Sequence, residues 1–213
     1  MTSSLKSLLA WWSASPLLLL LPGLSLAQNS TVWKTNYYAV TGTTLGEIHE
    51  SFRQARPWKE KSTYDGFTEW RINWRYQVTP SDEGCRCHSF TTQTAITVTL
   101  PRWTAPTNAV PGVREAWTKF FAALSKHESV HGQNAQAAAA EMHQRVNRLT
   151  TESDCAAVRS KVEETAQRVV AEFHQRDADF DRQTAHGTRD GASLPRRLQE
   201  EFPRRGPGGN PRR

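Results

Sequence analysis

Beyond residue 27, the sequence lacks any apolar run long enough to cross a bilayer. It also lacks a marked charge imbalance in its body. Of the formal net charge of +6, Lys6 supplies one unit and the tail from Pro195 supplies +4, which leaves +1 for residues 28–194. This body has no basic stripe interleaved with aromatic residues, the pattern typical of a nucleic-acid surface. We therefore expect neither a membrane span after residue 27 nor a nucleic-acid partner.

Cysteine is scarce, with three residues in 213. In an exported protein this number predicts one disulfide and one remaining thiol. Cys85 and Cys87 are too close in the sequence to bridge each other comfortably, so Cys155 is expected to pair with one of them. We take Cys87–Cys155 as the working assignment, with Cys85 as the alternative partner. A metal site built on the two thiols and His88 is less common in an oxidising compartment than a disulfide.

The first 27 residues differ from the rest and are typical of a cleaved signal peptide. Lys6 is their only charged side chain, and it precedes a leucine-rich stretch that Pro16 and Pro22 interrupt. Ser25 and Ala27 are the small residues that a signal peptidase requires, so cleavage is expected near Ala27. An uncleaved membrane anchor is the alternative, but the two prolines disfavour it. We expect the rest of the chain to be secreted or periplasmic.

The part of the chain up to residue 108 is predicted to be rich in β-structure. In the stretch FTEWRINWRYQV, alternate residues place Trp70 and Trp74 on one face and mostly polar side chains on the other. A threonine cap and a following proline bound one short helix. The expected elements are strands over residues 36–41, 67–78 and 90–100 and a helix over residues 45–55.

From residue 113 the hydrophobic period becomes that of a helix. Side chains expected to face inward recur at steps of three and four, at Trp117, Phe120, Phe121, Leu124, His127, Glu128 and His131. This spacing predicts a long amphipathic helix over residues 113–149. A serine or aspartate cap then begins a second helix, over residues 155–180. Residues 193–213 have no such pattern and are predicted to form a disordered basic tail.

Residues 127–131 of the first long helix read HESVH and match the sequence H-E-x-x-H. With seven histidines in the chain, chance would give this match in about one or two such chains in a hundred. Residues four apart share a helix face, so His127 and His131 can bind one Zn²⁺ while Glu128 serves as general base. Burying these three side chains without a partner would be costly. The alternative is a pair of core histidines that hydrogen-bond to their neighbours.

A catalytic zinc ion needs a third protein ligand and one open position. The extension that supplies this ligand in metzincins is missing, because Asn134 and Ala137 stand where its glycine and histidine would be. His143 and His174 are interpreted as ordinary surface histidines. The remaining candidates, on and beyond the second long helix, are Glu163, Glu164, Glu172, Asp177, Asp179, Asp181 and His186.

Several short motifs occur in an order that resembles one bacterial family. They are YYAV at 37–40, the strand with Trp70 and Trp74, LPRW at 100–103, HExxH at 127–131 and DxxTxHG at 181–187. This combination is more specific than HExxH alone. Over roughly residues 31–192 it is similar to the family catalogued as domain of unknown function 922 and described as predicted secreted zinc-dependent proteases.

The resemblance implies a zincin-like peptidase. It implies that His127 and His131 are zinc ligands and that Glu128 is the general base. The downstream motif makes His186 the preferred third ligand and Asp181 the next. Histidine is a common neutral zinc ligand, and the glycine that follows His186 would let the chain approach the metal closely.

Together these observations predict an α+β, zincin-like fold in which a small antiparallel or mixed sheet packs on two long helices, the first carrying HExxH. One domain, residues 28–192, is expected between a signal peptide (1–27) and the tail (193–213). The predicted function is that of an exported metallopeptidase with one catalytic Zn²⁺, hydrolysing protein or peptide substrates by a zinc-activated water. The alternatives are a non-catalytic envelope protein whose histidines have a structural or metal-storage role, and a zinc hydrolase of cell-wall peptides.

Overall fold

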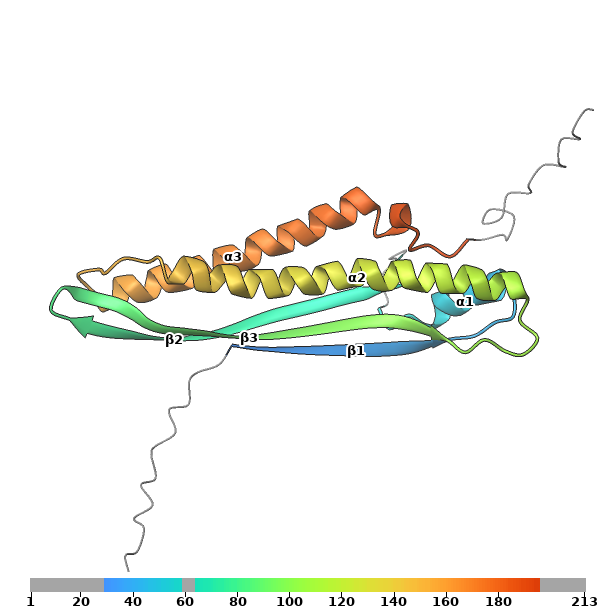
Figure 1. Cartoon of the computed structure of the whole chain (residues 1–213), viewed down its shortest axis with the longest axis horizontal. Helices are drawn as coiled ribbons and strands as arrows, with labels where there is room; N and C mark the ends of the chain where they lie inside the picture. Colours follow the sequence, from blue (N-terminus) through green and yellow to red (C-terminus); the bar gives the residue numbers. More distant parts are fainter. Residues whose placement is uncertain (1–28, 59–63, 196–213) are drawn as a thin grey trace, which may run out of the picture.

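Three strands form one mixed sheet in this computed structural model, which describes residues 29–58 and 64–195 (Figure 1). β1 runs parallel to β3, whereas β2 and β3 form an antiparallel hairpin. The predicted α+β class with a small mixed sheet is therefore confirmed. In the spatial order β1-β3-β2, the strands are β1 (Ser30–Val40), β2 (Phe67–Ser81) and β3 (Gly84–Trp103).

The two faces of β2 differ in burial as the alternation of its sequence predicts. Ile72 is buried and Trp70 and Trp74 are half-buried, whereas the intervening Glu69 and Arg71 are exposed. Both indole nitrogens of this face donate hydrogen bonds to carboxylates of the last long helix. The aromatic face of β2 is therefore turned towards the helices, which lie together on one side of the sheet (Figure 1).

The helices are α1 (Leu45–Ala55), α2 (Pro111–Val146) and α3 (Cys155–Thr184), and a short 3-10 turn, η1 (Thr188–Asp190), follows α3. α2 lies lengthwise over the sheet, and α3 returns beside it in the opposite direction (Figure 1). Thr44 forms a capping box at the start of α1, and Asp154 accepts from Ala156 N at 3.1 Å at the start of α3. Both long helices were predicted, but α3 continues to Thr184 instead of ending near residue 180.

Two hydrophobic clusters follow each other along α2. The first packs α1 and the sheet against the start of α2 and includes Phe52 and Leu124. The second packs β2, α3 and the end of α2 and includes Met142 and Val162. Residues 127–131 lie on α2 between Leu124 and Met142, so well-packed helix supports them on both sides.

The disulfide joins Cys85 to Cys155, so the assignment Cys87–Cys155 is wrong, and Cys87 is the free cysteine. At the start of β3, Cys85 N donates to Glu152 O at 2.7 Å, and Glu152 N donates to Cys85 O at 2.9 Å. This short β-bridge brings the first turn of α3 beside the strand, and the Cα atoms of the two bridged cysteines are 5.0 Å apart. The thiol of Cys87, two residues farther along, donates instead to Ser89 O.

Replacing both Cys85 and Cys155 with alanine is expected to lower the free energy of unfolding by about 2–5 kcal/mol. The bridge spans a sequence separation of 70 residues, so its loss frees a long loop in the unfolded chain. Denaturant titration measures the change, with Cys87→Ala as the control that leaves the bridge intact. A double variant as stable as the control would contradict this expectation.

The predicted signal peptide (1–27) and most of the predicted tail (193–213) lie outside the described residues. Within the described ranges, no helix combines the length and the hydropathy that crossing a bilayer requires. The disulfide is consistent with the predicted extracytoplasmic location, because such bonds persist in oxidising compartments.

Candidate metal centre

The two histidines and the glutamate of the HExxH sequence are buried on the inner side of α2. His127, Glu128 and His131 are 4%, 4% and 6% exposed. They continue the buried stripe of Leu124 because residues three and four apart share one face of a helix. Their expected inward orientation is therefore confirmed.

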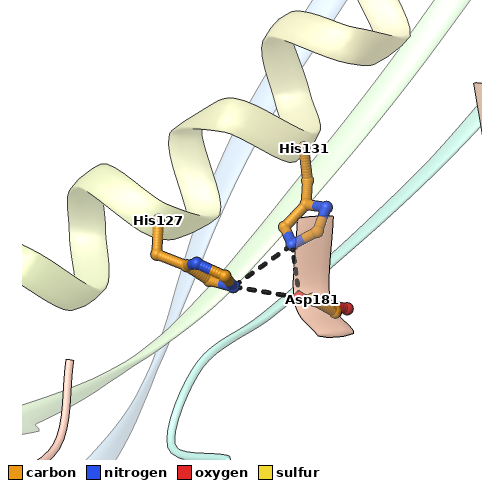
Figure 2. Close-up of side chains that lie close together, drawn as sticks. All are labelled: His127, His131 and Asp181. Carbon is orange, nitrogen blue, oxygen red and sulfur yellow. Dashed lines mark hydrogen bonds and ion pairs between the residues drawn. The ribbon is translucent and has the colours of Figure 1, made fainter. Parts of the chain in front are cut away.

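A carboxylate from α3 completes the cluster (Figure 2). Asp181 Oδ1 lies 3.1 Å from His127 Nε2 and 3.2 Å from His131 Nε2, and these two nitrogens are 3.4 Å apart. The His127 ring stacks on Phe180, with ring centroids 4.7 Å apart, which fixes its plane. Three potential ligand atoms from two helices thus converge on one point.

The separations of these three atoms fit a zinc ion. In a tetrahedral site with bonds of about 2.0–2.1 Å, two ligand atoms stand roughly 3.3–3.4 Å apart. The point equidistant from the three atoms lies about 1.9 Å from each, which is close to that bond length. Within the described ranges, His127, His131 and Asp181 are the one group of His, Cys, Asp or Glu side chains gathered closely enough to hold a metal ion.

His131 is oriented by a second carboxylate of α3. Its Nδ1 lies 3.0 Å from Asp177 Oδ1. Asp177 also accepts hydrogen bonds of 2.7 Å from Trp70 Nε1 and from Asn134 Nδ2, so its own position is fixed. Histidines that bind a metal usually donate their other ring N–H to a carboxylate or a carbonyl. Asp177 therefore has the place expected of the outer partner of a ligand histidine.

The surroundings hold both carboxylates in their charged form. Burial alone would raise the pKa of Asp181, but hydrogen bonds with His127 and His131 hold it well below its usual range. Burial would likewise lower the pKa of His131, yet hydrogen bonds with Asp177 and Asp181 raise it to about 10. Two half-buried, charged carboxylates thus face the two imidazoles, and a cation bound here would take the place of the proton that they stabilise on His131.

Replacing Asp177 with asparagine is expected to lower zinc affinity about 10–100-fold. A neutral amide can still accept from Trp70, so the fold should persist, but it orients His131 less firmly and lowers its basicity. Competition with a chromophoric chelator measures the affinity. Asp179→Asn is the matched control, because Asp179 lies on the same helix and accepts from Gln175. Equal losses in the two variants would contradict the assigned role.

Glu128 lies beside the converging atoms and is held by the start of β2. The Thr68 hydroxyl donates to Glu128 Oε2 at 2.7 Å. A β-carbon at Gly66 would lie 2.7 Å from Glu128 Oε1, so a larger residue there would have to displace this carboxylate. Burial raises the pKa of Glu128 above its ordinary value, although Thr68, His131 and His127 act against the rise. A carboxylate with a raised pKa is suited to accepting and returning a proton.

His186 is the third ligand preferred from the sequence. It lies next to the cluster, but it does not supply one of the three converging atoms. Its Nδ1 is 3.6 Å from Asp181 Oδ2, and its side chain is about half exposed. It follows the end of α3, where Ala185, His186 and Gly187 have φ values of 50°, 51° and 78°. A β-carbon at Gly187 would lie 3.1 Å from His127 Nδ1, so this glycine lets the chain pass close to the His127 ring.

The other acidic candidates from the sequence have partners outside the cluster. Glu172 accepts two hydrogen bonds from Arg145, Glu163 accepts from Trp74, Glu164 from Ser160 and Asp179 from Gln175. These carboxylates are therefore engaged elsewhere on α3 and its neighbours.

A cavity of about 410 Å³ adjoins the cluster, and much of its wall is aromatic. Tyr64 and Phe67 stack on one another with ring centroids 6.0 Å apart. His174, interpreted from the sequence as an ordinary surface residue, is exposed but stacks on Trp70, with ring centroids 4.0 Å apart, and lines the cavity. A substrate at this site would meet aromatic faces beside the converging ligand atoms.

Asp181 was expected from the sequence as the alternative third ligand, and Asp177 was among the candidates. The place of Asp177 beside His131 and the contributions of Thr68 and Gly66 were not expected. Asp177 and Asp181 repeat the four-residue spacing of the histidine pair, and that repeat could have indicated two carboxylates facing two imidazoles across paired helices. Thr68 belongs to the predicted inner face of its strand, which also could have been noticed. The sequence contains no signal for the close approach at Gly66, which depends on how β2 lies against α2.

The profile of a bacterial protein family, described as bacterial protein of unknown function (DUF922), matches residues 35–187. The matched range contains the whole cluster, from Thr68 on β2 to Gly187 after α3. The resemblance expected from the short motifs is therefore confirmed. Comparisons with curated proteins and with solved structures each found no match.

Proposed function

Because the chain belongs to a bacterial family of unknown function (DUF922), no relative lends it an activity, and we propose from its own site that it is an exported zinc-dependent metallopeptidase. One observation carries the proposal. His127 Nε2, His131 Nε2 and Asp181 Oδ1 lie 3.1–3.4 Å from one another, close enough to bind one ion, beside the buried carboxylate of Glu128.

In this proposal His127, His131 and Asp181 hold the zinc ion. A bound zinc ion lowers the pKa of a coordinated water and polarises the carbonyl of the substrate. Asp177 keeps the Nε2 atom of His131 directed at the metal by accepting from its Nδ1. His186, against the other oxygen of Asp181, is assigned no ligand role here.

Glu128 is proposed as the general base and later proton donor. Its Oε2 is held by Thr68, while its Oε1 faces the space that Gly66 leaves open. From this position the carboxylate can take a proton from the attacking water and deliver it to the leaving nitrogen. Its raised pKa makes the carboxylate a stronger base for the first of these steps.

A catalytic role is favoured over a structural one by the number of ligands. Structural zinc sites are usually closed by four protein ligands, whereas catalytic sites have three and one open position. The described residues supply three such atoms, and a cavity of about 410 Å³ adjoins them. The Cys85–Cys155 disulfide supports the exported location.

Metal analysis combined with hydrolysis assays tests the proposal. The purified protein is expected to bind one zinc ion per chain and to cleave casein or a library of blocked peptides. Treatment with 1,10-phenanthroline should abolish cleavage, and added zinc should restore it. Stoichiometric zinc without any hydrolysis would favour the structural alternative, and failure to bind zinc would refute the metal site itself.

A further inference from the structure

We infer that the groove between β2 and α3 is a specificity pocket that receives a large apolar side chain of the peptide substrate. This inference rests on the proposed peptidase function and names part of what that site recognises. The groove has a volume of about 490 Å³. Its apolar walls are Trp70, Ile72 and Trp74 from β2 and Val170 and Ala171 from α3.

The groove adjoins the cavity at the candidate metal centre. Trp70 and His174 line both spaces, and their rings stack at a centroid distance of 4.0 Å. An extended peptide held at the metal centre can therefore pass over this stacked pair and place one side chain in the groove. This adjacency favours a part of the substrate as the occupant over an unrelated partner.

The aromatic walls of the groove are fixed before anything binds. Trp70 Nε1 donates to Asp177 Oδ2 at 2.7 Å, and Trp74 Nε1 donates to Glu163 Oε2 at 3.1 Å. Both indoles are thus anchored to α3 through their nitrogens, and His174 covers one face of Trp70. Binding against pre-ordered tryptophans loses little conformational entropy, so the contact area contributes to affinity.

The apolar walls of the groove favour an apolar side chain over a polar one. A charged or amide side chain would leave water without gaining a hydrogen-bond partner from the five apolar residues. A phenylalanine, leucine or tryptophan side chain would instead exchange water for apolar surface. The polar residues that also line the groove, Arg71, Gln167 and His174, are exposed. The groove therefore has an apolar floor and a polar rim that is exposed to solvent.

The groove also adjoins the support of a ligand histidine. Asp177 accepts from Trp70 Nε1 with one oxygen and contacts His131 Nδ1 with the other. A side chain packed on Trp70 therefore touches the ring that helps to hold the carboxylate behind His131. Occupation of the groove and the geometry of the metal centre are connected through one residue.

Filling the groove tests the inference. In Ala171→Trp a large side chain is placed on an exposed position of α3 that lines the groove and lies outside the metal cluster. Product analysis of a blocked-peptide library, cleaved by the zinc-loaded protein, should show selection for large apolar residues at one substrate position. In the variant, kcat/KM for those peptides should fall at least about tenfold, while peptides with glycine at that position are cleaved as before.

Ala156→Trp is the matched control, because Ala156 is exposed near the start of α3 and does not line the groove. No selection by the unmodified protein, or an equal loss on all peptides in Ala171→Trp, would overturn the inference while leaving the peptidase proposal standing. If the zinc-loaded protein cleaves no peptide, the peptidase proposal fails. Calorimetric binding of phenylalanine-containing blocked peptides then decides on the groove, and binding that Ala171→Trp does not weaken overturns it.

Discussion

Replacing Glu128 with glutamine is expected to lower kcat about 10²–10⁴-fold while zinc content and fold are retained. The amide cannot accept the proton of the attacking water, so the step assigned to Glu128 is lost. Its carbonyl oxygen can still accept from the Thr68 hydroxyl, which preserves the packing of the start of β2 on α2. Steady-state kinetics, metal analysis and circular dichroism on the same preparation measure the three properties.

Two further variants serve as comparisons for Glu128→Gln. Glu128→Ala should also keep zinc, because the carboxylate is not one of the three converging atoms. Thr68→Val removes the hydroxyl that holds Oε2 and should reduce kcat less than either replacement of Glu128. Undiminished turnover in Glu128→Gln would exclude Glu128 as the base. Unfolding of both Glu128 variants, in a protein that cleaves nothing, would instead indicate a structural role.

Replacing His127 or Asp181 with alanine is expected to reduce zinc affinity by more than the roughly 10–100-fold predicted for Asp177→Asn. Each change removes one of three atoms that surround the proposed ion position, so too few ligands remain for a stable site. Activity should be lost together with the metal. Chelator competition for affinity and mass spectrometry for metal content are the measurements.

The matched comparison for Asp181 is His186→Ala. Because His186 contacts the outer oxygen of Asp181 and is about half exposed, its loss should lower zinc affinity far less. If the two variants lose zinc equally, His186 is a ligand after all and moves towards the metal when it binds. If only His186→Ala loses zinc, the assignment of Asp181 is refuted.

Periodicity made the central features of the fold predictable. The step of three and four residues that contains His127 and Glu128 indicated both the long helix and their inward direction, and the structure has both. The alternation in β2 likewise predicted its aromatic inner face. These features depend on neighbours within a few residues, and local pattern is sufficient to predict them.

Features that depend on long-range contacts were not predictable in the same way. A helix ending near residue 180 leaves Asp181 in a loop with His186, whereas continuation to Thr184 places Asp181 one turn beyond Asp177, facing α2. The choice of Cys85 over Cys87 depends on a bridge to the distant Glu152. Contacts between distant parts of the chain determine both the position of Asp181 and the partner of Cys155. A single sequence carries little information about such contacts.

The two ends of α3 are held by different interactions, a disulfide at its start and contacts with histidines of α2 near its end. Cys155 secures its first turn through a bond that reducing agents break, and Asp181 meets the histidine pair about 39 Å farther along the helix. The carboxylate of Asp181 thus lies near one end of a helix whose other end is held by a disulfide. Any property that needs Asp181 beside α2 therefore benefits from oxidising surroundings, in which that disulfide persists.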